Sequence, residues 1–153
     1  AVGSIGTLIS VIIAVASSVR AEKRKKKQAT YDAYQQFKKD VFLFESKSDN
    51  LNVNKIIELH KDGQSDKCWR CIKKYLTQIE RIATCVNNDI FDVETIYNMG
   101  GPYMIKQFDK FLPIIKYKRL EEGRNGVYYE FEKMVLKLSE LDFHLKKHGK
   151  NSV

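Results

Sequence analysis

The sequence has few residues that could form a structural disulfide or hold a metal. Its 153 residues include three cysteines and three histidines. An odd number of cysteines suits a reducing cytosol and argues against a disulfide framework. Cys68 and Cys71 have the C-x-x-C spacing, but they form an isolated pair, whereas a tetrahedral zinc site needs four ligands. A redox pair would follow a β-strand, and none precedes this one, so we interpret both as packing residues of a helix.

Catalytic motifs are also lacking. The sequence contains no glycine-rich phosphate loop and no serine-nucleophile motif. His144 and His148 are spaced i, i+4, but the glutamate of an H-E-x-x-H zinc motif is missing. We interpret them as solvated histidines at a helix C-terminus, where positive charge is favourable. The sequence therefore predicts neither a metal site nor a cofactor.

Charge is absent from the first 19 residues, AVGSIGTLISVIIAVASSV, and RAEKRKKK follows directly over residues 20–27. An uncharged stretch of this length is a transmembrane helix candidate, and as a helix it spans about 28 Å. Positive charge marks the cytoplasmic side of a span. The sequence predicts a transmembrane helix over residues 1–19, a basic juxtamembrane segment over 20–27 and a cytosolic helical domain over 28–153. This corresponds to a single-pass protein of the bacterial inner membrane.

Two other interpretations of this stretch compete with a transmembrane helix. A signal peptide carries positive charge before its apolar core, whereas here the charge follows. A buried helix of a soluble core stays open, because Gly3, Ser4, Gly6 and Thr7 make the stretch only moderately apolar. The chain begins with Ala1 and not with Met, and we expect a few native residues before it.

Small residues follow one face of the predicted span at steps of four and three. They are Gly3, Thr7, Ser10, Ala14, Ser17 and Ala21. Small side chains let helices approach closely in lipid, and hydroxyls there prefer a partner or water. The candidates for a face that packs several copies, or that lines a wet lumen, are Thr7, Ser10, Ala14 and Ser17. The alternative is a simple anchor whose small residues have no special role.

Basic residues are in excess, with 27 lysines and arginines against 19 aspartates and glutamates and a net charge of +8. The cations of residues 20–27 account for much of that excess. They suit membrane topology and binding to anionic lipid, and a basic collar also attracts RNA. If copies formed a ring, the candidates for its basic rim are Arg20, Lys23, Arg24 and Lys27.

The rest of the chain predicts an all-α fold, since no five-residue stretch alternates cleanly between apolar and polar residues. The first cytosolic helix is expected to continue the anchor to about residue 45. Its apolar positions, again at steps of three and four, are Tyr34, Phe37, Val41 and Phe44.

Two helices are predicted next. The first covers residues 54–61 and ends at Asp62-Gly63. The second covers residues 66–87, with Ser65 as its N-cap. Its apolar stripe consists of Cys68, Ile72, Tyr75, Ile79, Ile82 and Val86. Such a stripe is typical of a core helix.

Asp92 is expected to cap a short helix over residues 93–99, which Gly100-Gly101 ends. Another helix is predicted from Pro102, and Pro113 is expected to kink or restart it.

The last helix is predicted from near Asn125 to about Lys147, and its start carries a short motif. Residues 124–129 read Arg-Asn-Gly-Val-Tyr-Tyr. This resembles the R-N-x-x-x-H motif of HEPN domains, small helical bundles whose ribonuclease members cleave RNA with the arginine and histidine, paired across a dimer. Arg124 and Asn125 match, but Tyr129 stands at the histidine position.

A tyrosine at this position makes RNA cleavage doubtful, because a phenol with a pKa near 10 is a poor proton shuttle at neutral pH. The motif is therefore degenerate, and no intact catalytic site is predicted. The alternative is that Asn125 is only an N-cap and Arg124 a surface residue.

A wider resemblance covers most of the cytosolic domain. It is carried by Glu80-Arg81-Ile82-Ala83, by Asn87-Asn88 and by the run from Tyr103 to Pro113. These segments resemble a family of bacterial membrane-anchored helical domains of unknown function. The overall plan is similar to that of the membrane accessory proteins of type VI-B CRISPR systems, which combine one transmembrane helix, a basic collar and a divergent HEPN-like domain.

This resemblance implies an oligomeric membrane pore, or permeabilising effector, that assists an RNA-guided CRISPR nuclease in antiphage defence. Its implied partners are further copies in a ring, membrane lipid, and an RNA-guided nuclease or RNA. Two alternatives stay open: a membrane-tethered HEPN-like RNA-binding protein or ribonuclease, and a membrane adaptor without enzymatic activity.

Overall fold

The computed structural model describes residues 3–48, 51–64 and 66–149, and the side chains of residues 3–12, 42–43, 45–48, 66 and 148–149 lie outside that description. Every regular element in the described ranges is an α-helix, which confirms the predicted all-α class. The helices are α1 (Gly3–Ser48), α2 (Val53–Lys61), α3 (Asp66–Asn87), α4 (Val93–Glu122) and α5 (Tyr129–Gly149).

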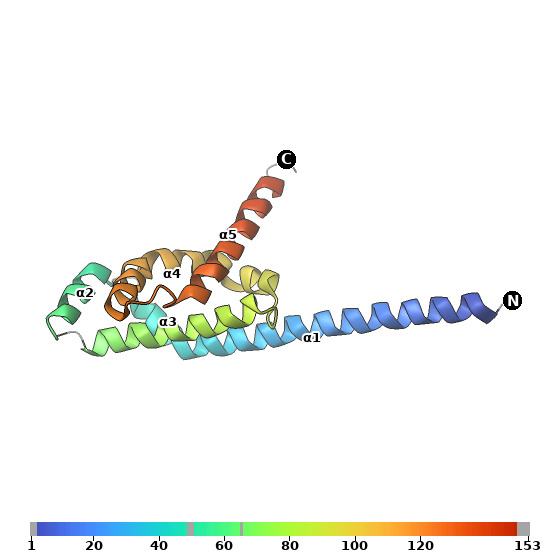
Figure 1. Cartoon of the computed structure of the whole chain (residues 1–153), viewed down its shortest axis with the longest axis horizontal. Coiled ribbons are helices and arrows are strands. Elements are labelled where there is room, and N and C mark those ends of the chain that lie inside the picture. Colours follow the sequence, from blue (N-terminus) through green and yellow to red (C-terminus); the bar gives the residue numbers. More distant parts are fainter. Residues whose placement is uncertain (1–2, 49–50, 65, 150–153) are drawn as a thin grey trace.

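Helix α1 is continuous from Gly3 to Ser48, and only its C-terminal part belongs to the bundle. Figure 1 shows the N-terminal part extending away from the other helices as a straight rod. Tyr34, Phe37 and Val41 are buried and Phe44 packs against the core, which confirms the predicted apolar positions. We call residues 3–25 of α1 the projecting segment.

Helix α3 lies at the centre of the bundle and contacts α1, α2 and α5. It covers Asp66–Asn87, the range that the sequence predicts. Ile72, Leu76, Ile79 and Ala83 are fully buried. The predicted N-cap, Ser65, lies outside the described residues.

The short helix α2 also agrees with its prediction to within one residue. It begins at Val53, and the Asn52 side chain caps it by accepting a hydrogen bond from the Lys55 amide. It ends at Lys61, before Asp62 and Gly63.

Helix α4 contains one kink, at Gly100. Asp92 caps its start as predicted, with its side chain accepting a hydrogen bond from the Thr95 amide at 2.9 Å. Gly100 has non-helical dihedral angles, so residues 93–99 form a separate helical turn before the longer part of α4. A Cβ atom on Gly100 would overlap the hydroxyl of Tyr34 on α1, so this glycine allows α1 and α4 to approach closely.

Of the two outcomes expected at Pro113, a kink or a restart, the restart is wrong, because α4 continues through this residue to Glu122. Pro113 lies on the exposed face of α4. The proline lacks the amide that would donate to the Asp109 carbonyl, but Asp109 is also exposed, so water can replace that donor.

The prediction that the last helix starts near Asn125 is also wrong, because α5 begins at Tyr129. Gly123 caps α4 in the left-handed conformation with φ of 60°, and residues 124–128 form a turn. Tyr128 also has positive φ, 55°, which is incompatible with a helix running through it. Arg119 holds this turn by donating a hydrogen bond from Nε to the Val127 carbonyl at 3.0 Å.

A buried hydroxyl fixes the point at which α1 leaves the bundle. Thr30 is 0% exposed, and its hydroxyl donates to the Lys26 carbonyl at 2.7 Å and accepts from the Asp92 amide at 2.8 Å. The start of α4 is thereby attached to one turn of α1, and the projecting segment begins directly before it.

We expect Gly100→Ala to lower the free energy of unfolding by about 1–3 kcal/mol, as overpacking does in a filled core. The added methyl group would overlap the buried Tyr34 ring. Chemical denaturation followed by circular dichroism measures this change.

Gly126→Ala is the matched control, since a Cβ there meets nothing within 4 Å. It should be neutral or slightly stabilising. Adding Tyr34→Phe to Gly100→Ala removes the overlapping hydroxyl and should restore part of the loss. Equal stability of Gly100→Ala and Gly126→Ala would contradict the packing described at this kink.

Candidate functional site

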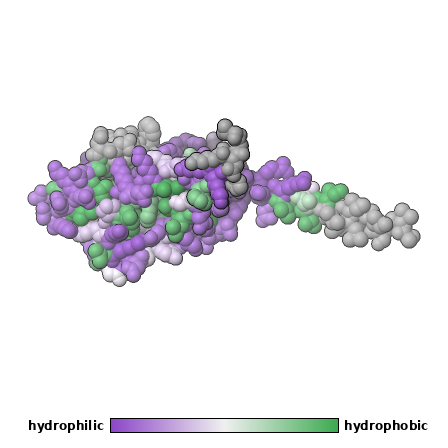
Figure 2. Space-filling view, turned by 90° about the horizontal axis from the view of Figure 1, so that it is seen from above, coloured by the Kyte–Doolittle hydropathy of each residue, from purple (hydrophilic) through white to green (hydrophobic). Residues whose placement is uncertain are grey.

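The projecting segment of α1 exposes large apolar side chains that no other part of the described chain covers. Ile13, Val15 and Val19 are 60%, 57% and 58% exposed, and every described side chain from residue 13 to residue 25 is exposed. Figure 2 shows hydrophobic colour on the rod, followed by hydrophilic colour towards the bundle. Such a contiguous apolar surface is typical of a contact with lipid or with another protein.

The predicted packing stripe lies on this segment. Ala14 and Ser17 are exposed on it. The backbones of Thr7 and Ser10 are helical, but their side chains lie outside the described residues. The span predicted over residues 1–19 is helical from Gly3 onwards.

Among the described residues, none of the helices combines the length and the apolar character that crossing a bilayer requires.

The basic juxtamembrane segment divides into two parts. Arg20, Lys23 and Arg24 are exposed on the rod. Lys27 is half-buried at the bundle, with its Nζ 3.9 Å from a carboxylate oxygen of Glu94. Similarly, Nζ of Lys26 lies 3.8 Å from Oδ1 of Asp89. Of the four predicted rim residues, three are therefore available on the rod, whereas Lys27 contacts α4.

The degenerate motif lies in the turn before α5 and does not form a catalytic pocket. Arg124 and Asn125 are exposed, and Tyr129 is 53% exposed at the first residue of α5. The Arg124 guanidinium contacts the Glu122 carboxylate at 2.6 Å. Asn125 is four residues before the helix start, so it is not the N-cap that the sequence suggested.

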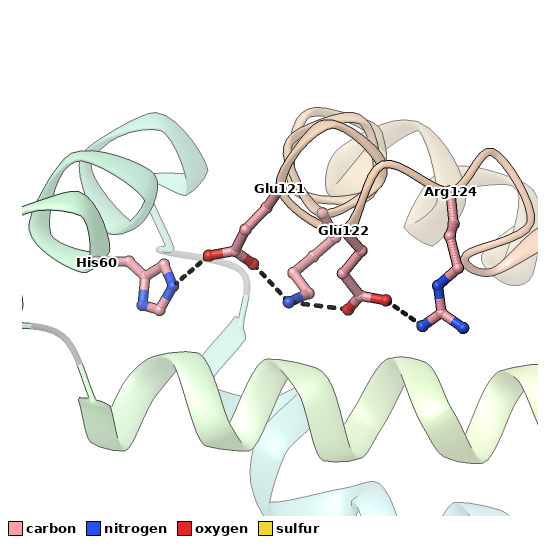
Figure 3. A network of polar contacts seen from close by, with 5 residues as sticks. His60, Glu121, Glu122 and Arg124 are labelled. Atoms are coloured by element: carbon pink, nitrogen blue, oxygen red, sulfur yellow. Dashed lines mark hydrogen bonds and ion pairs between the residues drawn. The ribbon is translucent and has the colours of Figure 1, made fainter.

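Arg124 is the end of a polar network that connects α4 with α2 (Figure 3). Lys118 lies in its middle, with Nζ 2.6 Å from Glu121 and 3.1 Å from Glu122. Glu121 in turn lies 3.4 Å from His60 Nε2. His60 stacks on Trp69 at a ring distance of 3.9 Å, so the network ends against the aromatic edge of the core.

The charges of this network stabilise one another. Burial opposes the charge of Lys118, but the hydrogen bonds to Glu121 and Glu122 outweigh it and raise the pKa of the ammonium. The hydrogen bond from Lys118 lowers the pKa of Glu121, and the hydrogen bond from Arg124 lowers that of Glu122. Arg124 is therefore paired with a carboxylate, which competes with any phosphate ligand.

Cys68 of the C-x-x-C pair does not have the environment of a reactive thiolate. Cys68 and Cys71 line a groove of about 810 Å³ between the end of α1 and the start of α3, beside Lys67 and Lys74. Burial and the neighbouring Cys71 raise the pKa of Cys68, which favours the neutral thiol. In the described part of the chain, no group of three or more metal-ligating side chains comes together.

Glu80 is a position that the sequence analysis did not recognise as a cap. It lies on α3, and its carboxylate accepts hydrogen bonds from the amides of Glu130 at 3.1 Å and Phe131 at 2.7 Å. These amides belong to the first turn of α5, where backbone donors have no partner within the helix. Glu80 thus replaces the missing local N-cap of α5.

The electrostatics of Glu80 reflect two opposing effects. Burial is the larger one and raises its pKa, whereas the two backbone hydrogen bonds lower it. The positive end of the α5 dipole adds to the stability of the carboxylate. Asn87, two turns along α3, donates to the carbonyl of Glu130 at 2.8 Å and so fixes the same turn.

A sequence signal for both residues exists. Leu76, Glu80, Ala83 and Asn87 follow one another at i, i+4, i+7 and i+11. Leu76 and Ala83 are buried, so Glu80 and Asn87 lie on a buried side of α3. Polar residues at such positions require a partner.

The chain matches the family described as a domain of unknown function, DUF4760, over residues 4–138. The chain belongs to this family. The DUF4760 match begins in the projecting segment and ends at Leu138, a fully buried residue of α5. The projecting helix is therefore part of the unit that the family shares. Neither the curated proteins nor the solved structures gave a match.

We expect Glu80→Ala to lower the free energy of unfolding by about 1–2 kcal/mol, because the first turn of α5 loses the acceptor for two amides. Chemical denaturation measures the change, and hydrogen exchange at the amides of Glu130 and Phe131 should accelerate.

Arg81→Ala is the control for this variant, because Arg81 is the exposed neighbour of Glu80. Its stability should stay within about 0.5 kcal/mol of the wild type, as for most surface substitutions. The capping role would be excluded if Glu80→Ala behaved like Arg81→Ala.

Proposed function

We propose that this DUF4760 protein is a single-pass membrane protein whose copies assemble through α1 into a pore, with the helical bundle on the cytoplasmic side of the bacterial inner membrane. The observation that carries this proposal is the exposed apolar surface of the projecting segment, formed by Ile13, Val15 and Val19. A domain that remained in water would hide such a surface or lose it.

The dimensions of α1 are consistent with this arrangement. Residues 3–19 of α1 reach about 26 Å, which approximates the hydrocarbon core of a bilayer. Residues 20–29 add about 15 Å before the buried Thr30. The exposed cations Arg20, Lys23 and Arg24 then lie at the level of the lipid head groups, where anionic lipid binds them.

Assembly is supported by the small-residue face of α1. Exposed Ala14 and Ser17 allow close approach of neighbouring helices, and the hydroxyls of the same face suit a wet lumen. In a ring, Arg20, Lys23 and Arg24 of each copy surround the cytoplasmic opening. A positive rim repels cations and concentrates anions.

The further role as an accessory to an RNA-guided CRISPR nuclease in antiphage defence rests on the resemblance described above. The HEPN-like assignment of the bundle has the same basis. In this proposal, the bundle senses or binds the nuclease or its RNA, and the membrane helices permeabilise the membrane.

The ribonuclease alternative is disfavoured by the geometry of the motif. Arg124 is paired with Glu122, and Tyr129 replaces the histidine on an exposed helix start. The ribonuclease alternative predicts that the protein cleaves RNA and that Arg124→Ala abolishes this cleavage. The adaptor alternative predicts that an unrelated membrane span supports function equally well.

Single-channel recording of the purified full chain in planar bilayers tests the proposed function. We expect discrete conductance steps from the wild type and none from a variant in which residues 1–19 are replaced by an unrelated span of equal length. Failure of the wild type to conduct at any concentration would overturn the pore proposal.

A charge variant provides the matched control. Replacing Arg20, Lys23 and Arg24 by glutamate should shift ion selectivity from anions towards cations while conductance persists. The same three replacements on the bundle surface, at Lys39, Lys73 and Lys116, should leave selectivity unchanged, since these exposed lysines lie on the bundle.

A further inference from the structure

Helix α5 carries a second exposed stripe, in which apolar and charged residues alternate. We call it the α5 stripe: Tyr129, Lys133, Leu136, Glu140 and Phe143. These residues are spaced by four, three, four and three, so they follow one face of the helix. The opposite face of α5 packs into the core through Phe131, Met134 and Leu138.

The apolar members of the α5 stripe are strongly exposed. Leu136 is 62% exposed, Phe143 is 64% exposed and Tyr129 is 53% exposed. Figure 1 shows that the C-terminal part of α5 extends beyond the other helices. A repeated apolar residue every seven positions on an exposed helix face is typical of a helix–helix contact.

The α5 stripe is complementary to itself when it is reversed end for end. Reversal about Leu136 places Tyr129 of one copy beside Phe143 of the other, and it places Lys133 within one residue of Glu140 along the helix. Leu136 then meets Leu136 of the second copy. Each contact occurs twice, as a two-fold interface requires.

We propose that the α5 stripe is a docking surface for the α5 stripe of a second copy of this chain, in antiparallel orientation. Charge decides the orientation, because a parallel pair would place Lys133 beside Lys133 and Glu140 beside Glu140. Ion pairs at an exposed site contribute little affinity, but they select one arrangement and reject another.

The apolar contacts supply most of the affinity, and three residues per copy make a small interface. Dimerisation through α5 is therefore weak in dilute solution. Any attachment that holds the copies near one another raises their effective concentration. The interface does not depend on α1 spanning a membrane, and if every copy uses it, a closed assembly contains an even number of subunits.

Cysteine crosslinking of the full chain in detergent tests the interface. In a background with Cys68, Cys71 and Cys85 replaced by serine, Leu136→Cys should give a covalent dimer with a short bismaleimide. Leu120→Cys is the control, because Leu120 is 83% exposed but lies on α4 and is not part of the α5 stripe. Equal yields from the two variants would overturn the proposal.

Charge reversal then tests the orientation. Lys133→Glu and Glu140→Lys should each lower the Leu136→Cys crosslinking yield at least about threefold, and the double reversal should restore it. Lys116→Glu, an exposed change on α4, should leave the yield unchanged. A double reversal that crosslinks no better than either single reversal would overturn the antiparallel pairing.

Both readouts remain informative if α1 does not form a pore, since crosslinking reports only the proximity of α5 helices. Conversely, a pore whose Leu136→Cys variant fails to crosslink would exclude the α5 interface and leave the proposed function intact.

Discussion

The continuity of α1 is the constraint on which the rest of this structure depends. One helix runs from Gly3 to Ser48, so the apolar projecting segment and the buried Tyr34, Phe37 and Val41 belong to a single rigid element. Each turn satisfies its own backbone hydrogen bonds, which lets the helix leave the bundle without leaving unpaired donors.

Polar contacts at helix ends hold the remaining helices in place around that rod. Thr30 binds the start of α4, Glu80 caps the start of α5, and Tyr97 on α4 donates to Asp142 on α5 at 2.8 Å. Each of these contacts joins positions far apart in the sequence. The apolar core supplies the driving force for folding, and these few buried groups determine which helix ends meet.

Local periodicity predicted the helices well and their tertiary caps poorly. The stripe of α3 and the first buried turns of α1 followed from spacing alone, because burial on one helix face leaves a period of 3.6 residues. The sequence predicts the start of α5 too early, because Asn125 resembles a local N-cap. The acceptor for the Glu130 amide is instead the Glu80 carboxylate, 50 positions earlier in the chain. The polar network from His60 to Arg124 could not be predicted from the sequence either. Spacing within one helix does not specify which side chain of another helix will be the partner. The pairing of Arg124 with Glu122 likewise depends on the folded turn.

Two exposed apolar surfaces of the described chain, the projecting segment of α1 and the α5 stripe, are the basis for the proposed assembly of several copies. Native mass spectrometry of the full chain released from detergent micelles tests this directly. Assembly through α1 predicts one closed species of six or more copies, with an even number if every copy also pairs through α5. A monomer at all concentrations, or a dimer that never grows, would contradict assembly through α1.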